Sequence, residues 1–255
     1  AYESGEFTKD LDALIAEESE VLEKLRNLAA YHILYSKINY VFRSGGYVRS
    51  EEEHAMVEEI AQHPLIVGKN TALSHRAATI CYYTQGFCAW AKRDWRTGLT
   101  KFMRVKEILD KEKALRADLA KRYIRTLHYI ISAQIELGEF KGARDHIKLM
   151  RAMTDEPAFG GIQIAVQVFN ASYLSELRLL DRMGEHAKAL ELVPAVLTGL
   201  EEEGPRLHKE HELEFWWALS CAYFGAGEMN KALFWLNKLL NDTEPTLRQD
   251  LFTYA

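Results

Sequence analysis

Two histidines offer the most direct opportunity for metal chemistry in this sequence. His208 and His211 stand three residues apart, which would put both imidazoles on one face of a helix, with Glu212 or Glu214 close by. The pattern differs from H-E-x-x-H, and it follows Gly204-Pro205, where a helix is expected to begin. A solvated, charged helix end is the better interpretation, so we expect no metal site.

No other group of residues has the spacing of a catalytic or cofactor site. The sequence contains no G-x-x-x-x-G-K-[ST] loop, no G-x-S-x-G elbow and no Cys-x-x-Cys pair. Cys81, Cys88 and Cys221 lie within apolar helical patterns, as small buried residues of a reducing compartment do. We therefore expect a cytoplasmic protein that is not an enzyme and uses no cofactor.

The charge distribution argues against a general affinity for polyanions, because the 255 residues carry a formal net charge of −5. Residues 92–148 have a surplus of Lys and Arg. This surplus is typical of solvated helix faces, and the alternative is a patch for an acidic protein or a nucleic acid. Nucleic acid is the weaker candidate because no recognition motif accompanies the patch. No apolar run reaches the roughly 18–20 residues of a membrane helix, so we expect no membrane partner.

Two amphipathic helical patterns face each other across a glycine turn between residues 213 and 241. Their apolar positions are Trp216, Leu219 and Tyr223, then Ala232, Leu236 and Leu239. The turn, Gly227-Glu228, has upstream echoes in Gly184-Glu185 and Gly138-Glu139, and a weaker one in Arg93-Asp94. Small residues follow each turn at corresponding places, where they would let the second helix approach the first: Gly98, Ala143, Ala189 and Ala232. The chain is thus expected to consist of repeated helix–turn–helix units.

This spacing resembles the tetratricopeptide repeat (TPR) family. The matching positions are Trp216, Leu219, Tyr223, Ala232 and Pro245. Ser220 and Leu236 replace the usual Gly and aromatic residue, and the turns recur every 40–47 residues or so instead of 34. The resemblance implies an all-α fold, an α–α superhelix or TPR-like solenoid of about five units, whose first helices line a concave face.

The predicted units form a single array, with an incomplete unit at each end. They are 1–17 (partial), 18–66, 70–112, 115–154, 161–203, 207–242 and 246–255 (partial). The acidic run at 17–20 is read as a turn or as the first turn of the next helix. Ser50 and Glu53 predict a capping box, and Pro194 predicts a kink or a break. The incomplete ends indicate a fragment of a longer protein.

The resemblance also implies which residues line the concave face. They are Tyr40, Arg43, Tyr83, Phe87, Trp90, Arg125, His128, Leu174, Arg178 and Trp217. Aromatic residues and spaced arginines suit an extended peptide. An alternative for the aromatic residues is packing between neighbouring units. The family's clamp for C-terminal carboxylates is not matched, because Ser36, Tyr40, Tyr83 and Phe87 stand at its positions.

These observations predict a protein–protein interaction module that binds a partner polypeptide along the concave face, as a monomer or an end-to-end dimer. The alternative is a peptide-sensing regulatory TPR domain whose output domain is absent from this chain.

Overall fold

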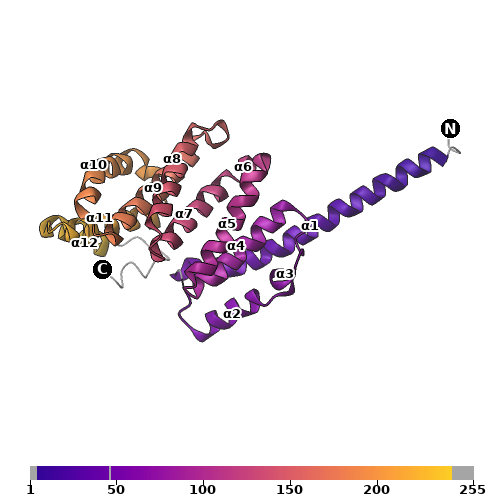
Figure 1. Ribbon diagram of the computed structural model, residues 1–255, viewed down its shortest axis with the longest axis horizontal. Coiled ribbons are helices and arrows are strands. Elements are labelled where there is room, and N and C mark those ends of the chain that lie inside the picture. The colour runs from indigo at the N-terminus through magenta and orange to yellow at the C-terminus, as the bar shows by residue number, and fades with distance from the viewer. Residues whose placement is uncertain (1–4, 46, 243–255) are drawn as a thin grey trace.

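The protein is all-α in the residues that its computed structural model describes, 5–45 and 47–242. Twelve α-helices and three short 3-10 helices pack mainly in chain order there (Figure 1). The α-helices are α1 (Gly5–Gly45), α2 (Glu51–Ala61), α3 (Pro64–Val67), α4 (His75–Ala91), α5 (Trp95–Lys111), α6 (Lys113–Asp118), α7 (Ala120–Glu136), α8 (Phe140–Ala152), α9 (Ile162–Arg182), α10 (His186–Glu203), α11 (Lys209–Gly225) and α12 (Met229–Leu240). The 3-10 helices are η1 (Met153–Asp155), η2 (Pro157–Phe159) and η3 (Gly204–Arg206). The predicted partial unit at 246–255 lies outside the described residues.

Four helix pairs follow one another: α4 with α5, α7 with α8, α9 with α10, and α11 with α12. Helix α9 also packs against α7 and α11, so the first helices of the last three pairs lie side by side, whereas α7 packs mainly against α5 of the first pair. The predicted range 161–203 holds α9 and α10, and the range 207–242 holds α11 and α12. Helix α10 continues through Pro194 without a break. None of the described helices is long and apolar enough to cross a membrane.

Two expected boundaries differ in the structure. The partial unit 1–17 does not exist as a separate helix, because α1 runs unbroken through the acidic residues 17–20. Glutamates are good helix formers, and the run contains neither glycine nor proline to end the helix. The predicted first helix of the range 115–154 is divided at Leu119, which separates α6 from α7 with φ −106 and ψ 29.

The capping box before α2 is confirmed in a slightly wider form. The side chain of Ser50 accepts a hydrogen bond from the backbone N–H of Glu53 at 3.2 Å. The carboxylate of Glu53 in turn accepts from the backbone N–H of Arg49 at 2.8 Å, one residue before the cap. The box therefore satisfies one of the open donors in the first turn of the helix, that of Glu53, and fixes the chain just before the cap.

The turn inside each pair has one common geometry. A residue with positive φ follows the first helix in all four: Arg93 (59°), Gly138 (74°), Gly184 (69°) and Gly227 (81°). The next residue is acidic in each case, and its N–H donates to a carbonyl five residues earlier, at 2.8–2.9 Å. This is the hydrogen bond of a Schellman-type helix end, which requires the left-handed conformation. Glycine adopts that conformation without the steric penalty that a side chain brings.

We expect Gly184→Ala to lower the free energy of unfolding by about 1 kcal/mol, because a Cβ at φ 69° is strained although nothing lies within 4 Å of it. The measurement is urea unfolding followed by circular dichroism. Gly204→Ala is the matched control, since its Cβ would also meet open space but its φ is −48°. Equal unfolding free energies for the two variants would contradict this account of the turn.

Small residues in the second helices bring the members of each pair together. Ala143 and Ala189 have no exposed surface, and Gly98 and Ala232 are also buried. A Cβ on Gly98 would lie 3.7 Å from the carbonyl oxygen of Gly86 in the facing helix α4. The main hydrophobic core extends from α1 to α9, and a second cluster joins α9, α10 and α11.

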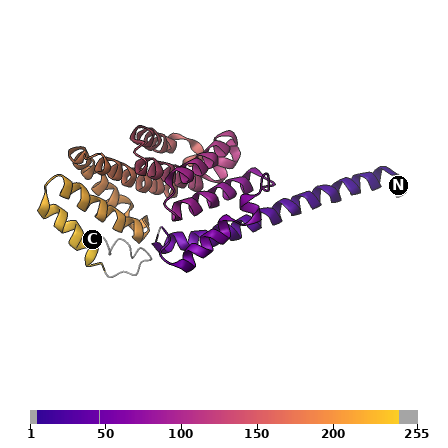
Figure 2. The ribbon, with the colours of Figure 1, turned by 60° about the horizontal axis from the view of Figure 1, so that its bottom comes forward.

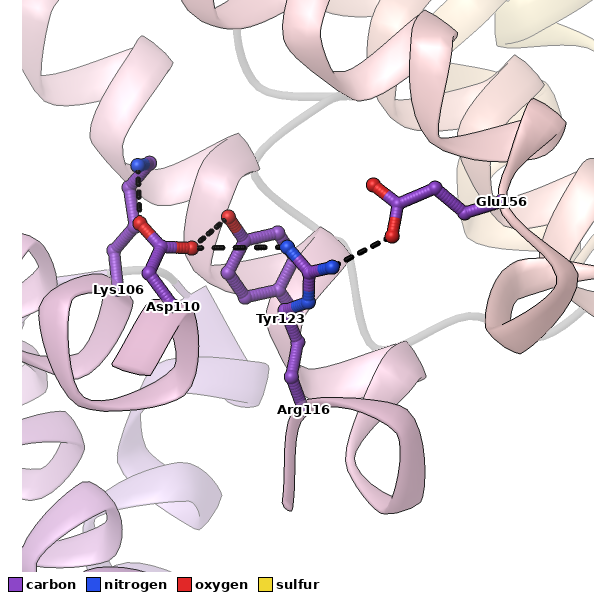
Figure 3. A network of polar contacts seen from close by, with 5 residues as sticks. All are labelled: Lys106, Asp110, Arg116, Tyr123 and Glu156. Carbon is purple, nitrogen blue, oxygen red and sulfur yellow. Dashed lines mark hydrogen bonds and ion pairs between the residues drawn. The ribbon is translucent and has the colours of Figure 1, made fainter. Parts of the chain in front are cut away.

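A polar network ties α5, α6 and α7 to the segment after α8 (Figure 3). The hydroxyl of Tyr123 donates to Asp110 at 2.5 Å, and the ammonium of Lys106 binds the other oxygen of that carboxylate at 2.7 Å. Arg116 bonds to Glu156 at 2.6 Å and its guanidinium lies 5.5 Å from the centre of the Tyr123 ring. Burial, and then the neighbouring Asp110 carboxylate, raise the pKa of Tyr123, so the phenol remains a donor.

Tyr123→Phe should lower the free energy of unfolding by about 1.5–3 kcal/mol, because the half-buried Asp110 carboxylate loses a neutral hydrogen-bond donor. Thermal and urea denaturation would measure the loss. Tyr40→Phe is the control, because the Tyr40 side chain is 73% exposed and should cost nothing detectable. A variant as stable as the unmodified protein would show that this network does not support the fold.

Candidate functional site

Three residues predicted to line the concave face are buried in the core instead. Tyr83, Phe87 and Leu174 expose 2%, 1% and 4% of their surface. The Tyr83 and Phe87 rings meet edge to face with their centres 4.9 Å apart, within a cluster that includes Tyr35, Phe102 and Tyr129. Eleven of the seventeen residues of α4 are buried because helices cover it on several sides. These three side chains therefore pack between helices and are not available to a partner.

The other predicted residues are distributed over several surfaces. Trp90 and Trp217 are half-buried against neighbouring aromatic or apolar side chains, and Tyr40 is exposed on α1. His128 is half-buried, with its Nδ1 3.3 Å from the Ser175 hydroxyl. Arg125 and Arg178 are exposed. The side chain of Arg43 lies outside the described residues.

A basic pocket of about 290 Å³ lies where the N-terminal parts of α7, α9 and α11 come together. Of the predicted residues, it contains only Arg125. Its full lining is Lys121, Arg125, Ile162, Gln163, Val166, Gln167, Asn170, Arg206, Leu207, His208 and His211. The pocket lies nearer the N-termini of these helices than the predicted surface of α9 and α11 does. The prediction therefore missed the pocket because it placed the binding surface too far along these helices.

The cations near the start of α7, of which Lys121 and Arg125 line the pocket and Arg122 does not, have no carboxylate partner among the described residues. Lys121 donates to the side-chain oxygen of Gln163 at 2.9 Å. Arg122 lies over the ring of Tyr35 at 5.9 Å, and burial is the main effect that lowers its pKa. The electrostatic neighbours of Arg125 are tyrosines, chiefly Tyr83. This strip, Lys121, Arg122 and Arg125, thus presents positive charge that no internal anion neutralises.

The arginine and histidines on the other side of the pocket lie close to carboxylates. Arg206 pairs with Glu203 at 3.0 Å, the Nδ1 of His211 lies 3.2 Å from Glu214, and the Nδ1 of His208 lies 3.7 Å from Glu210. No group of three or more His, Cys, Asp or Glu side chains in the described residues is placed to hold a metal ion. The positive character of the pocket therefore comes chiefly from α7.

Two polar atoms near this strip are buried without a hydrogen-bond partner. One is the side-chain oxygen of Asn170, a residue 7% exposed that lines the pocket. The other is the hydroxyl of Tyr83, whose charged neighbours are Arg125 and Arg122. Buried polar atoms are normally paired, and leaving one unpaired costs about 1–3 kcal/mol. Asn170 is the more informative of the two because this residue also lines the pocket.

The three cysteines are not part of a reactive site. All are free, and burial raises the pKa of each thiol, to about 12 for Cys88 and about 11 for Cys221. A raised pKa keeps the sulfur in the thiol form, which is a poor nucleophile.

No family model, curated protein or solved structure matches this chain. The pocket itself is therefore the best guide to function. Most of its residues were missed in the sequence, although Gln163, Gln167 and Asn170 stand at i, i+4 and i+7 of one helix. That polar stripe in an otherwise apolar helix was the available signal.

His32 reports on the positive potential of this region. Partial desolvation, and then the charges of Arg122 and Arg76, lower its pKa below the ordinary 6.5. A His with a lowered folded-state pKa contributes stability above the unfolded-state pKa, and this contribution is lost as the pH falls below about 6.5.

We expect an NMR titration of the His32 ring to give a pKa below 6.5, and Arg122→Gln to move that pKa upward. Arg144→Gln removes the same charge at a site paired with Glu185, so it serves as the control and should leave His32 unchanged. An unchanged His32 pKa in Arg122→Gln would mean that the α7 cations do not set the local potential.

Proposed function

We propose that this protein is an interaction module that binds an extended partner polypeptide along the first helices of a TPR-like superhelix. The four identical turns and the small residues buried after them support a repeated helix–turn–helix architecture. Parallel first helices bring residues from units far apart in the sequence onto one surface, which is how repeat proteins build long binding faces.

The unpaired side-chain oxygen of Asn170, in a pocket shared with Arg125, is the observation on which the proposal rests. A peptide backbone offers an N–H donor and a carbonyl acceptor at regular intervals, and an asparagine side chain can accept from one and donate to the other. Bound backbone would thus provide the partner that Asn170 lacks. A pocket of about 290 Å³ holds a few residues of such a segment, not a folded domain.

The chemistry of α7 favours an acidic segment. Arg125 and Lys121 have no competing carboxylate, so a glutamate or aspartate of the partner would not have to displace an internal ion pair. Arginine binds carboxylates through two parallel N–H···O bonds, which fixes the orientation of the partner as well as its charge. The expected partner is therefore a polypeptide segment carrying at least one carboxylate beside exposed backbone.

The test is selection from a displayed library of random peptides, followed by affinity measurement on a selected peptide by fluorescence anisotropy. We expect enrichment of Asp and Glu. Arg125→Glu should weaken binding at least about tenfold, and Asn170→Ala about threefold to tenfold, in line with the loss of an ion pair and a hydrogen bond.

Arg96→Glu is the matched control, because it makes the same charge change at an exposed residue that does not line the pocket. Circular dichroism would establish that each variant is folded. Equal affinities for Arg96→Glu and Arg125→Glu would mean that only net charge matters, and a library that yields no binder would contradict the proposal.

A further inference from the structure

The N-terminal half of α1 extends away from the rest of the molecule as a single helix (Figures 1 and 2). Every side chain from residue 10 to residue 26 is exposed. The helix meets the body at Asn27, whose side-chain nitrogen donates to the carbonyl of Thr71 at 2.9 Å and whose oxygen accepts from the N–H of Leu73 at 3.0 Å. We refer to residues 10–26 as the arm.

The arm carries an apolar stripe along one side. Its members are Leu11, Leu14, Ile15, Val21, Leu22 and Leu25, which are 45–62% exposed. Positions 11, 14, 18, 21, 25 and 28 alternate steps of three and four residues, which is the a and d spacing of a coiled coil. Only Glu18 interrupts the apolar pattern at these positions. The opposite side holds alanines and charged residues.

A stripe of this kind is not expected to stay in water on a lone helix. Isolated helices of this length are marginal, and amphipathic helices in proteins gain most of their stability by packing the apolar side. The body of the same chain cannot cover the stripe, because the arm points away from it (Figure 2).

We propose that the arm pairs with the arm of a second copy of this chain in an antiparallel coiled coil. The charges select both the partner and the direction. Residues 10–20 contain five acidic residues and no basic one, whereas residues 21–26 contain Lys24 and Arg26 with only Glu23. Antiparallel pairing lays the acidic part of one arm along the basic part of the other. Parallel pairing in register would place acidic beside acidic and Glu18 against Glu18.

One antiparallel register pairs leucines in the core and opposite charges beside it. It sets Leu14 opposite Leu25 of the second copy, so these leucines meet in the core, and it places Glu18 opposite Val21. The same register brings Glu17 near Lys24 of the second copy. Lys24 also contacts Glu20 within its own helix, and a second acidic neighbour would add to that pair.

Sedimentation equilibrium across a series of protein concentrations tests the pairing. The unmodified chain should form dimers, and Leu14→Glu/Leu25→Glu should raise the dissociation constant more than about 100-fold, since each dimer then buries four charges in place of leucines. The control is Ala13→Glu/Ala16→Glu, which adds the same charge to the other side of the arm. A chain that is monomeric throughout, or a dimer equally affected by both variants, would overturn the proposal.

Disulfide formation tests the direction. Chains with Leu14→Cys and chains with Leu25→Cys are mixed, oxidised and analysed by mass spectrometry. Antiparallel pairing predicts disulfides between the two kinds of chain. Disulfides that join Leu14→Cys chains to one another, and Leu25→Cys chains likewise, would show parallel pairing and overturn the arrangement. The native cysteines lie outside the arm, and burial keeps their thiols protonated.

Discussion

The left-handed residue at the end of each first helix is the constraint on which the rest of the structure depends. It reverses the chain within three residues, so the second helix packs back onto the first, and the buried small residues set how closely it does so. The same turn occurs four times, and in the last three pairs the first helices α7, α9 and α11 lie in sequence beside one another. The basic pocket exists because their N-terminal parts converge, although Lys121, Gln163 and His208 are more than 40 residues apart in sequence.

Those local features are also the ones that the sequence could predict. The turn is specified almost entirely by neighbouring residues. Its sequence pattern is a glycine, an acidic residue directly after it, and a small residue five positions after the glycine. The capping residue Ser50 was predictable for the same reason. The acidic run in α1 was ambiguous, because carboxylates favour a helix start as well as a helix interior, and nothing local decides between the two.

The site was harder to predict because it depends on contacts between units. Tyr83 and Phe87 lie on a helix that is apolar on nearly every side, so periodicity could not tell which side faces a groove. The structure decides this by surrounding α4 with α1, α2, α3 and α5. Asn170 by itself has no distinguishing signal in the sequence, because the burial of its side-chain oxygen without a hydrogen-bond partner depends on the packing of several helices.

The arginines of this mildly acidic protein differ in whether the fold gives them an internal anion. Arg144, Arg151 and Arg182 are each within 2.8 Å of a glutamate outside their own helix, and a ligand that bound them would first have to break that pair. Arg122 and Arg125 instead have tyrosines as neighbours, which offer a ring face or a phenol but no charge. A carboxylate that reached them would gain its full attraction with no internal pair to break. Which of the many cations on this surface binds a carboxylate would then depend on which of them the fold leaves without an internal anion.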